Sequence, residues 1–495
     1  MFKVGFDNDK YLQMQSARIR ERINSFGGKL YLEFGGKLFD DFHASRVLPG
    51  FAPDSKIRML MKIKDQAEIV IVVSAVAIAQ NKMRADLGIT YDTDTIRLID
   101  AFTGIGLYVG SVVITQYTAQ PAVDAFIKRL ENLGVRVFRH YPIPGYPTNA
   151  KLIASEEGCG KNDYIETKRS LVVITAPGPG SGKMATCLSQ LYHDNQRGIK
   201  SGYAKFETFP IWNLPLSHPV NLAYEAATAD LSDVNMIDPF HLEAYGTTTV
   251  NYNRDVEIFP VLRLIFESIY GSCPYKSPTD MGVNMAGLCI TDDEAVREAA
   301  KMEIVRRYYD TLCKKARGLA DADEVYKLEL IMNRAGVAPD YRACVKAALD
   351  REAETGGPAV AIELADGRIV TGKTTTLLGA SAAALLNVLK VLGGINDAIH
   401  LLPPAVIEPI CHLKTEVLGG HNPRLHADEI LIALTMSATT NPAAALAMEQ
   451  LPRLRNTEAH ASVIVSAVDS ALYRKLGIRL TTEPKYQTKK LYHAQ

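Results

Sequence analysis

Residues Ser170–Lys183 read SLVVITAPGPGSGK and join an apolar run to a glycine-rich turn. The run Ser170–Thr175 is rich in Val and Ile, which is typical of a strand buried on both faces of a parallel sheet. The turn Ala176–Gly182 leads through Lys183 into a helix that begins at Met184. Glycines let backbone amides approach an anion at the start of a helix, so this order is typical of a phosphate-binding loop. The stretch predicts an α/β fold with an anion site at a strand's carboxyl end.

The predicted phosphate ligands are three glycines, a hydroxyl and a lysine of this turn: Gly178, Gly180, Ser181, Gly182 and Lys183. The match to a P-loop is incomplete, because Pro177 replaces its first glycine and Met184 replaces its magnesium-binding Ser or Thr. Pro179 also removes one amide donor. We therefore expect plain anion binding rather than magnesium-dependent hydrolysis of a nucleoside triphosphate. The alternative is a structural turn whose glycines satisfy sterics alone.

Strands and helices alternate on both sides of this turn. Further strands are predicted at Lys29–Phe34, Glu68–Ser74, Ser111–Thr115, Val135–Tyr141 and Tyr203–Trp212. Helices are predicted at Asp94–Val109 and Pro121–Leu133. Such alternation predicts a doubly wound, mainly parallel sheet, in which ligands sit outside the carboxyl ends of the strands.

Three domains are predicted from the length of 495 residues and from changes in texture along the chain. Residues 1–225 form a Rossmann-like α/β domain that carries the glycine loop. Residues 226–335 form a helical subdomain, in which Ala295–Lys315 is the clearest helix. Residues 336–495 form a mixed α+β domain.

A second motif, Gly367–Thr374, matches the P-loop pattern letter for letter. Its first glycine lies in the turn Ala365–Gly367, which we expect to join the strands Ala359–Leu364 and Arg368–Thr371 in a hairpin. A P-loop needs a strand before its first glycine and loop residues that are free to wrap a phosphate. We therefore expect no P-loop here.

Polar residues of several other segments are candidates to line the ligand cleft: Glu33, Gly35, Gly36, Lys37, Asn253, Arg254, Lys276 and Asp280. The first four stand at the end of the first predicted strand, and the others lie in polar, aromatic loops of the kind that often carry function. The alternatives are a surface turn for the former and interdomain or subunit contacts for the latter. No catalytic residue and no organic cofactor is assigned.

No structural metal is expected. His421 and His426 are five residues apart across Pro423, so no helical face unites them as ligands. A metal-dependent hydrolase or deaminase in the C-terminal domain is kept as an alternative, because two carboxylates follow these histidines.

Charge and cysteine content exclude several classes of protein. The 55 basic and 55 acidic residues balance, which argues against nucleic-acid and membrane partners that would need a basic surface. The seven widely spaced cysteines fit reduced thiols in a cytosol. The longest apolar run, Ile69–Ala79, is shorter than the ~20 residues of a membrane helix. We expect a cytoplasmic protein.

Several long motifs of this chain resemble one bacterial family. They are Ser16–Arg22, Leu32–Lys37, Thr175–Lys183, Asp238–Gly246, Asn251–Asp255, Thr371–Thr374 with Leu378–Ala382, and Asn441–Ala444. The family is uncharacterised protein family 0371, also called domain of unknown function 1846. The resemblance covers nearly the whole chain and implies a bacterial, cytosolic protein with an α/β N-terminal part and further helical and mixed subdomains. It transfers no catalytic residue.

The leading hypothesis is a protein that binds a phosphorylated small molecule, such as a nucleotide or sugar phosphate, at the Gly178–Lys183 loop. Group transfer is the reaction class that such a site suits, because phosphate clamps position more than they react. The alternative is a non-catalytic oligomeric ligand sensor or scaffold. Under either hypothesis we expect a homo-oligomer.

Overall fold

The computed structural model of the protein describes residues 3–36, 38–39, 41–84, 87–231 and 233–487. The chain divides into two compact units. The N-terminal unit comprises residues 4–225 and 233–299, and the C-terminal unit comprises residues 1–3, 226–232 and 300–495. The three predicted domains stay a prediction.

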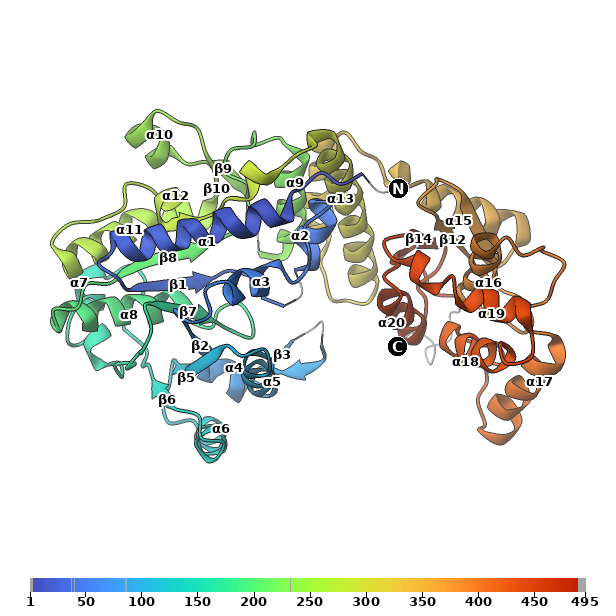
Figure 1. The fold of residues 1–495 in the computed structure, drawn as a ribbon, viewed down its shortest axis with the longest axis horizontal. Coiled ribbons are helices and arrows are strands. Elements are labelled where there is room, and N and C mark those ends of the chain that lie inside the picture. The colour runs from blue at the N-terminus through green and yellow to red at the C-terminus, as the bar shows by residue number, and fades with distance from the viewer. Residues whose placement is uncertain (1–2, 37, 40, 85–86, 232, 488–495) are drawn as a thin grey trace. The chain divides into compact units, whose positions relative to one another are not determined.

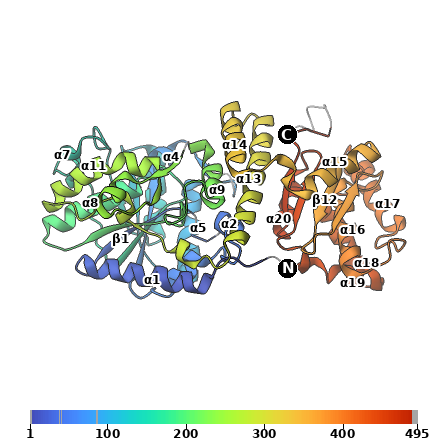
Figure 2. The same ribbon diagram turned by 90° about the horizontal axis from the view of Figure 1, so that it is seen from above.

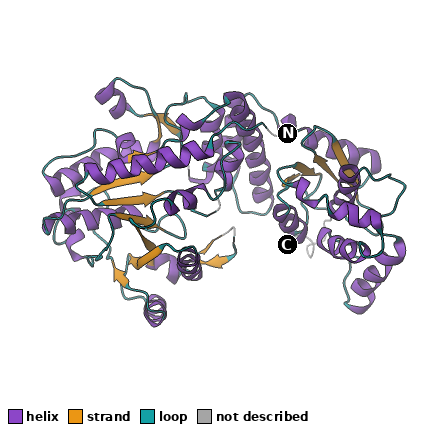
Figure 3. Ribbon diagram, viewed as in Figure 1, coloured by secondary structure: helices purple, strands orange, loops and turns teal. Residues whose placement is uncertain are grey.

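A seven-stranded parallel sheet forms the centre of the N-terminal unit (Figure 3). Its strands are β1 (Leu30–Phe34), β2 (Ala67–Ser74), β5 (Tyr108–Thr115), β6 (Val137–Arg139), β7 (Leu171–Thr175), β8 (Gly202–Phe206) and β11 (Gly282–Val283). Their spatial order is β11-β8-β1-β7-β2-β5-β6, and every neighbouring pair is parallel. Two short antiparallel ladders lie outside this sheet and pair β3 (Met83–Arg84) with β4 (Ile89–Thr90) and β9 (Asn235–Ile237) with β10 (Val250–Tyr252). The predicted α/β class with a mainly parallel sheet is confirmed.

Helices cover both faces of this sheet (Figure 1, Figure 2). On one face, α7 (Ala150–Ile153), α8 (Lys183–Gln196) and α11 (Asn253–Tyr270) share a buried cluster with strand residues such as Tyr31, Val72 and Ile174. Helix α1 (Asn8–Ser25) lies on the other face and contacts β8, β11 and α3 (Ser55–Met61). The remaining helices of this part of the chain are α2 (Phe42–Val47), α4 (Ala75–Ala79), α5 (Tyr91–Gly104), α6 (Pro121–Asn132), α9 (Pro219–Ala227), α10 (Pro239–Tyr245) and α12 (Pro278–Met281).

Among the predicted elements, one helix and one strand differ most from their bounds in the structure. The helix expected to reach Val109 ends at Gly104, where the Leu107 amide closes back on the Phe102 carbonyl, and β5 begins at Tyr108. The strand expected to reach Trp212 ends at Phe206. Beyond it, the carbonyls of Thr208 and Pro210 accept hydrogen bonds from the side chain of Asn284 at 3.2 and 3.0 Å instead of continuing a ladder.

A four-stranded mixed sheet organises the C-terminal unit. Its order is β13 (Ile369–Lys373), β12 (Ala359–Glu363), β14 (Glu458–Ala461) and β15 (Arg479–Thr482); β12 is antiparallel to both neighbours, whereas β14 and β15 are parallel. Val360 and Ile362 pack into the main core with α16 (Ala380–Gly393), whereas Ala361 faces α15 (Ala343–Thr355). The other helices are α13 (Asp293–Ala316), which spans the boundary between the units, α14 (Ala322–Ala335), α17 (Pro404–His412), α18 (Ala427–Ser437), α19 (Pro442–Met448) and α20 (Ala467–Lys475). The predicted hairpin at Ala365–Gly367 is confirmed, so Gly367–Thr374 is no P-loop.

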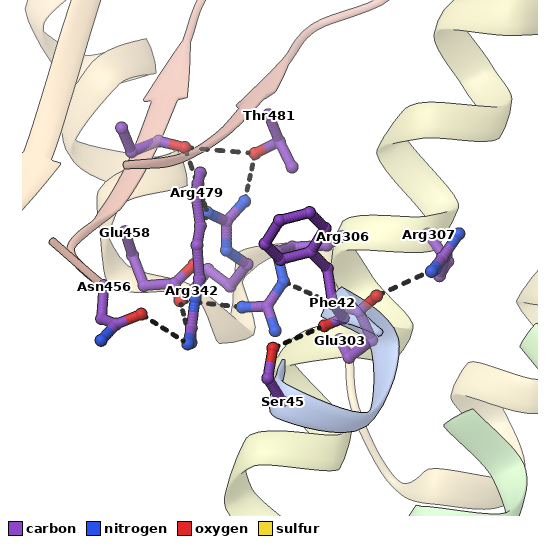
Figure 4. A network of polar contacts seen from close by, with 11 residues as sticks. Phe42, Ser45, Glu303, Arg306, Arg307, Arg342, Asn456, Glu458, Arg479 and Thr481 are labelled. Carbon is purple, nitrogen blue, oxygen red and sulfur yellow. Dashed lines mark hydrogen bonds and ion pairs between the residues drawn. The ribbon is translucent and has the colours of Figure 1, made fainter. Parts of the chain in front are cut away.

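A buried ion-pair network ties helices to this second sheet (Figure 4). Glu458 of β14 accepts from Arg306 and Arg342 at 2.8 Å each and from Arg479 at 3.3 Å. Arg306 also bonds Glu303, its neighbour on α13, at 2.7 Å. Burial alone would raise the pKa of Glu458, but the three guanidinium groups hold it below its ordinary value.

None of the helices in the described part of the chain is long and apolar enough to cross a membrane.

Candidate anion-binding and acid–base site

The glycine loop between β7 and α8 has two residues in the left-handed backbone region. Gly180 and Gly182 have φ values of +74° and +89°, which side chains with a Cβ adopt only with strain. The hydroxyl of Thr115, the last residue of β5, donates to the Ser181 carbonyl at 2.6 Å and anchors the loop. The Ser181 hydroxyl donates to the Gly178 carbonyl and is therefore engaged within the loop.

Several backbone amides of this loop have no protein acceptor. Among the described residues, the N–H groups of Gly180, Gly182 and the first three residues of α8, Lys183–Ala185, form no hydrogen bond. Helix α8 is 14 residues long, so its N-terminus adds a partial positive charge at the same place. Together these groups can hold an oxyanion through backbone donors.

Lys183 supplies an uncommitted cation beside these amides. Its side chain is half-buried, and within the described chain it forms neither an ion pair nor a hydrogen bond. It lies close enough to the Cys187 thiol, one turn along α8, to lower the pKa of that thiol, although burial dominates and raises it. A buried ion pair at Lys183 would have argued against anion binding, and none is present in the described structure.

Glu33 lies on the face of the sheet that α8 covers. Its Oε2 accepts a hydrogen bond of 2.7 Å from the Tyr203 hydroxyl, and its strand places it directly beside Lys205 of β8. After burial, Glu33 is the strongest influence that raises the pKa values of Tyr203, Cys187 and Tyr146. Residues of a strand, a helix and a loop therefore surround this carboxylate at the carboxyl edge of the sheet.

A buried lysine with two carboxyl groups continues the site along β8. Lys205 donates to the Tyr252 hydroxyl and to Asp255, both close contacts, and its Nζ lies 3.3 Å from Oε1 of Glu207. Burial alone would lower the pKa of Lys205, but Asp255, Glu207 and Glu33 raise it above its ordinary value. The lysine is therefore a fixed positive charge.

Glu207 differs from its neighbours because neither of its carboxyl oxygens has a hydrogen-bond partner in the described structure. Burial and, to a smaller extent, Asp255 raise its pKa to about 8 against the lowering effect of Lys205. A carboxyl group with this pKa exchanges its proton near neutral pH. That is the property of a general acid or base.

The glycines after β1 lie at the same edge of the sheet, next to a second buried lysine. The Gly35 amide donates to the Phe206 carbonyl at 3.3 Å, and Lys56 donates to the Gly35 carbonyl at 3.4 Å. Lys56 also pairs with Asp41 at 2.8 Å. A Cβ built on Gly36 would lie 3.4 Å from Nζ of Lys56, so this lysine lies beside both glycines. Lys37 lies outside the described residues.

Asn253 and Arg254 hold a segment at the border of the Lys205 cluster. The Asn253 side chain accepts from the Val234 amide at 3.1 Å, and Arg254 makes a two-point ion pair with Asp233 at 2.6 and 2.7 Å. Burial raises the pKa of Asp233, whereas Arg254 and, to a smaller extent, Lys205 act to lower it, so Asp233 is within electrostatic range of Lys205. Both residues position the segment that borders the site.

Lys276 and Asp280 form a separate contact. Asp280 accepts from the Lys276 amide at 3.0 Å and from the Tyr245 hydroxyl at 2.7 Å. The Lys276 ammonium lies 5.3 Å from the centre of the Tyr245 ring. Among the described residues, no hydrogen bond or ion pair joins this group to the glycine loop.

The two histidines considered as metal ligands have different surroundings. His426 contacts Asp469 and Ser466, each at 3.4 Å. No group of three His, Cys, Asp or Glu side chains suited to a metal ion occurs in the described part of the chain, and His421 is in an exposed loop.

Four members of the site are absent from the sequence-based candidates: Tyr203, Lys205, Glu207 and Asp255. A local signal exists for the first three, because they alternate at every second position and so share one face of a strand. A lysine inside a buried strand is rare unless it is paired. Asp255 carries no such signal, since only the fold brings it to Lys205.

Comparison with known proteins gives matches along nearly the whole chain. The family model "Domain of unknown function DUF1846, N-terminal" matches residues 4–336, and "Domain of unknown function DUF1846, C-terminal" matches residues 340–492. A UPF0371 protein of Streptococcus thermophilus is 58% identical over 492 residues, which are 99% of this chain and 100% of the relative. A UPF0371 protein of Streptococcus pneumoniae is 58% identical over 493 residues, with the same coverage.

Proposed function

The chain belongs to the family described as domain of unknown function DUF1846, as its motifs predict, and from the site we propose that it binds a phosphorylated small molecule. The phosphate would occupy the cradle formed by the amides of Gly180, Gly182 and Lys183–Ala185. Gly178 and Ser181 would shape the loop, and the Lys183 ammonium would neutralise the anion.

One observation supports this proposal: within the described chain, loop amides without an acceptor, the N-terminus of α8 and a lysine without a partner lie together. A turn that served sterics alone would not need Lys183 to be both half-buried and unpaired. Burying a lysine without a partner costs free energy, and an anionic ligand would offset that cost. The balance of basic and acidic residues over the whole chain is compatible with anion binding that is confined to this one loop.

The neighbouring carboxyl cluster makes group transfer the best-supported reaction. Glu207 exchanges its proton near neutral pH, and Lys205 holds a fixed charge 3.3 Å away. Glu33, which accepts a hydrogen bond from Tyr203, is suited to accept another from a hydroxyl group of the ligand. In this scheme Glu207 moves the proton, and the glycine loop positions the phosphoryl group.

Isothermal titration calorimetry tests the binding step. The probes are inorganic phosphate, pyrophosphate, sugar phosphates and nucleotides, and the variants are Lys183→Met and, as a matched exposed lysine, Lys128→Met. We expect at least one probe to bind the native chain and its affinity to fall about tenfold or more in Lys183→Met only. Equal affinities in the native chain and in Lys183→Met would overturn the proposal.

Turnover of a bound ligand separates the enzyme from the alternative, a ligand sensor or scaffold. We expect Glu207→Gln to reduce turnover while the affinity for the phosphorylated ligand is kept. Binding without turnover in the native chain would favour the sensor. Cytoplasmic location and a homo-oligomeric state stay predictions from the sequence.

A further inference from the structure

We propose that a pocket in the C-terminal unit, beside β13, binds the oxyanion group of a small organic molecule. The pocket has a volume of about 250 Å³ and is bordered by β13, α15 and α16. That volume is well above the ~10–15 Å³ that a single water needs, which suits a small ligand. Because the pocket belongs to the other unit, the inference stands apart from the function proposed above.

Two cations, and no acidic residue, occur among the described residues that line this pocket. Lys373 of β13 is exposed, and within the described chain its side chain forms no ion pair or hydrogen bond. Arg351 of α15 pairs with Glu354 at 3.0 Å through Nη1, but its Nε–H is buried and has no partner in the described structure. The pocket therefore carries a local excess of positive charge.

The other lining residues indicate which ligand body would fit beside the anionic group. Asn387 donates to the Thr371 carbonyl at 2.9 Å, and the Thr375 hydroxyl accepts from the Leu378 amide at 3.0 Å, so these groups are held in place. Leu378 and Leu386 form an apolar wall. A ligand with an anionic head and a small apolar body matches both walls.

The motif Gly367–Thr374 has a role in strand packing beside this pocket rather than that of a P-loop. A Cβ on Gly372 would lie 2.1 Å from the backbone nitrogen of Ala384, so glycine is needed for the close approach of β13 to α16. Residues of β13 pair with β12, as Lys373 does with Ala359, and cannot wrap a phosphate. Recognition therefore depends on side-chain charges, and affinity should fall as salt concentration rises.

Calorimetry of the full chain tests the pocket with three probes: phenyl phosphate, benzoate and inorganic phosphate. Benzoate separates a carboxylate from a phosphate ligand, and inorganic phosphate measures the head group alone. The variants are Lys373→Met and Arg351→Met, with Lys346→Met as the control, because Lys346 is an exposed lysine of α15 outside the pocket. All measurements are made in the Lys183→Met background as well, which removes the proposed loop cation.

We expect phenyl phosphate or benzoate to bind and to lose about tenfold or more in affinity in Lys373→Met and in Arg351→Met, but not in the control. Circular dichroism checks that each variant is folded. Unchanged affinity in both pocket variants, or no binding of any probe at about 10 mM in the Lys183→Met background, would overturn the proposal. Failure of the glycine loop to bind phosphate would leave this result unaffected.

Discussion

The Nζ atom of Lys205 lies 3.3 Å from Oε1 of Glu207, and the same lysine is in close contact with Asp255. One ammonium thus faces two buried carboxyl groups. Asp255 takes the closer contact, and Glu207 remains without a hydrogen-bond partner in the described structure. Because the pKa of Glu207 is raised to about 8, the pair of carboxyl groups holds an exchangeable proton at neutral pH.

Glu207 is expected to make the protein less stable as the pH rises from about 5 to 8. Its carboxyl has a higher pKa in the folded chain than in the unfolded chain, so the folded state binds more protons within this window. The free energy of unfolding should fall by up to ~1.4 kcal/mol per pH unit from this one group. Glu207→Gln should lack this slope, which thermal unfolding of both proteins from pH 5 to 9 measures. Parallel pH profiles for the two proteins would contradict the assignment.

The two left-handed glycines of the anion loop should differ in their tolerance of alanine. Gly180→Ala meets no atom within 4 Å and should cost only the ~1–2 kcal/mol of a left-handed backbone. Gly182→Ala adds a contact of 3.0 Å with Thr115, the residue that anchors the Ser181 carbonyl. We therefore expect a larger loss of thermal stability and of phosphate affinity in Gly182→Ala. A larger loss in Gly180→Ala would show that the loop is held differently.

The parallel sheet could be predicted from sequence because its strands are continuous apolar runs. Every residue of β2 and β7 is buried, so each reads as a Val- and Ile-rich segment between turn signals. The glycine loop was predictable for the same reason, since it directly follows one of these runs. The position of β7 between β1 and β2 was not, because strand order depends on long-range packing.

The acid–base cluster shows where sequence reasoning ends. Lys205 and Asp255 are 50 residues apart and meet only because α11 packs over β8. The raised pKa of Glu207 depends on its burial and on Asp255, which no local pattern contains. Charge pairs of this kind can be identified only once the fold is known, whereas a glycine loop can be recognised from the sequence alone.

His426 should stabilise the C-terminal unit more at low pH than at high pH. Its hydrogen bond to Asp469 raises its pKa in the folded chain, against the lowering effect of burial. The contribution is full below the unfolded pKa of about 6.5 and is lost as the pH rises through the folded value. The side chain is about one-third exposed and the contact is 3.4 Å long, so the effect should stay under ~1 kcal/mol. Hydrogen exchange of α18 amides in His426→Asn and native protein at pH 5 and 8 measures it; an equal difference at both values would argue against it.

Removal of one arginine from the buried network of Figure 4 should be far more costly than removal of a peripheral one. Arg342 is fully buried and joins Glu458 to the carbonyls of Ala459 and Arg479, so Arg342→Met leaves a buried carboxylate with fewer partners. We expect a loss of about 3–5 kcal/mol, as for other broken buried ion pairs.

Arg307→Met is the matched control, because Arg307 is about one-quarter exposed and, among the described residues, its side chain pairs with Glu303 alone, at 2.9 Å. Its loss should stay below about 1 kcal/mol. Adding Glu458→Gln to Arg342→Met should recover part of the stability, since the uncompensated charge is then removed. Hydrogen exchange of β14 amides gives these values for the C-terminal unit alone. If Arg342→Met and Arg307→Met cost the same, the network does not hold α13 and α15 to the sheet in the way the contacts indicate.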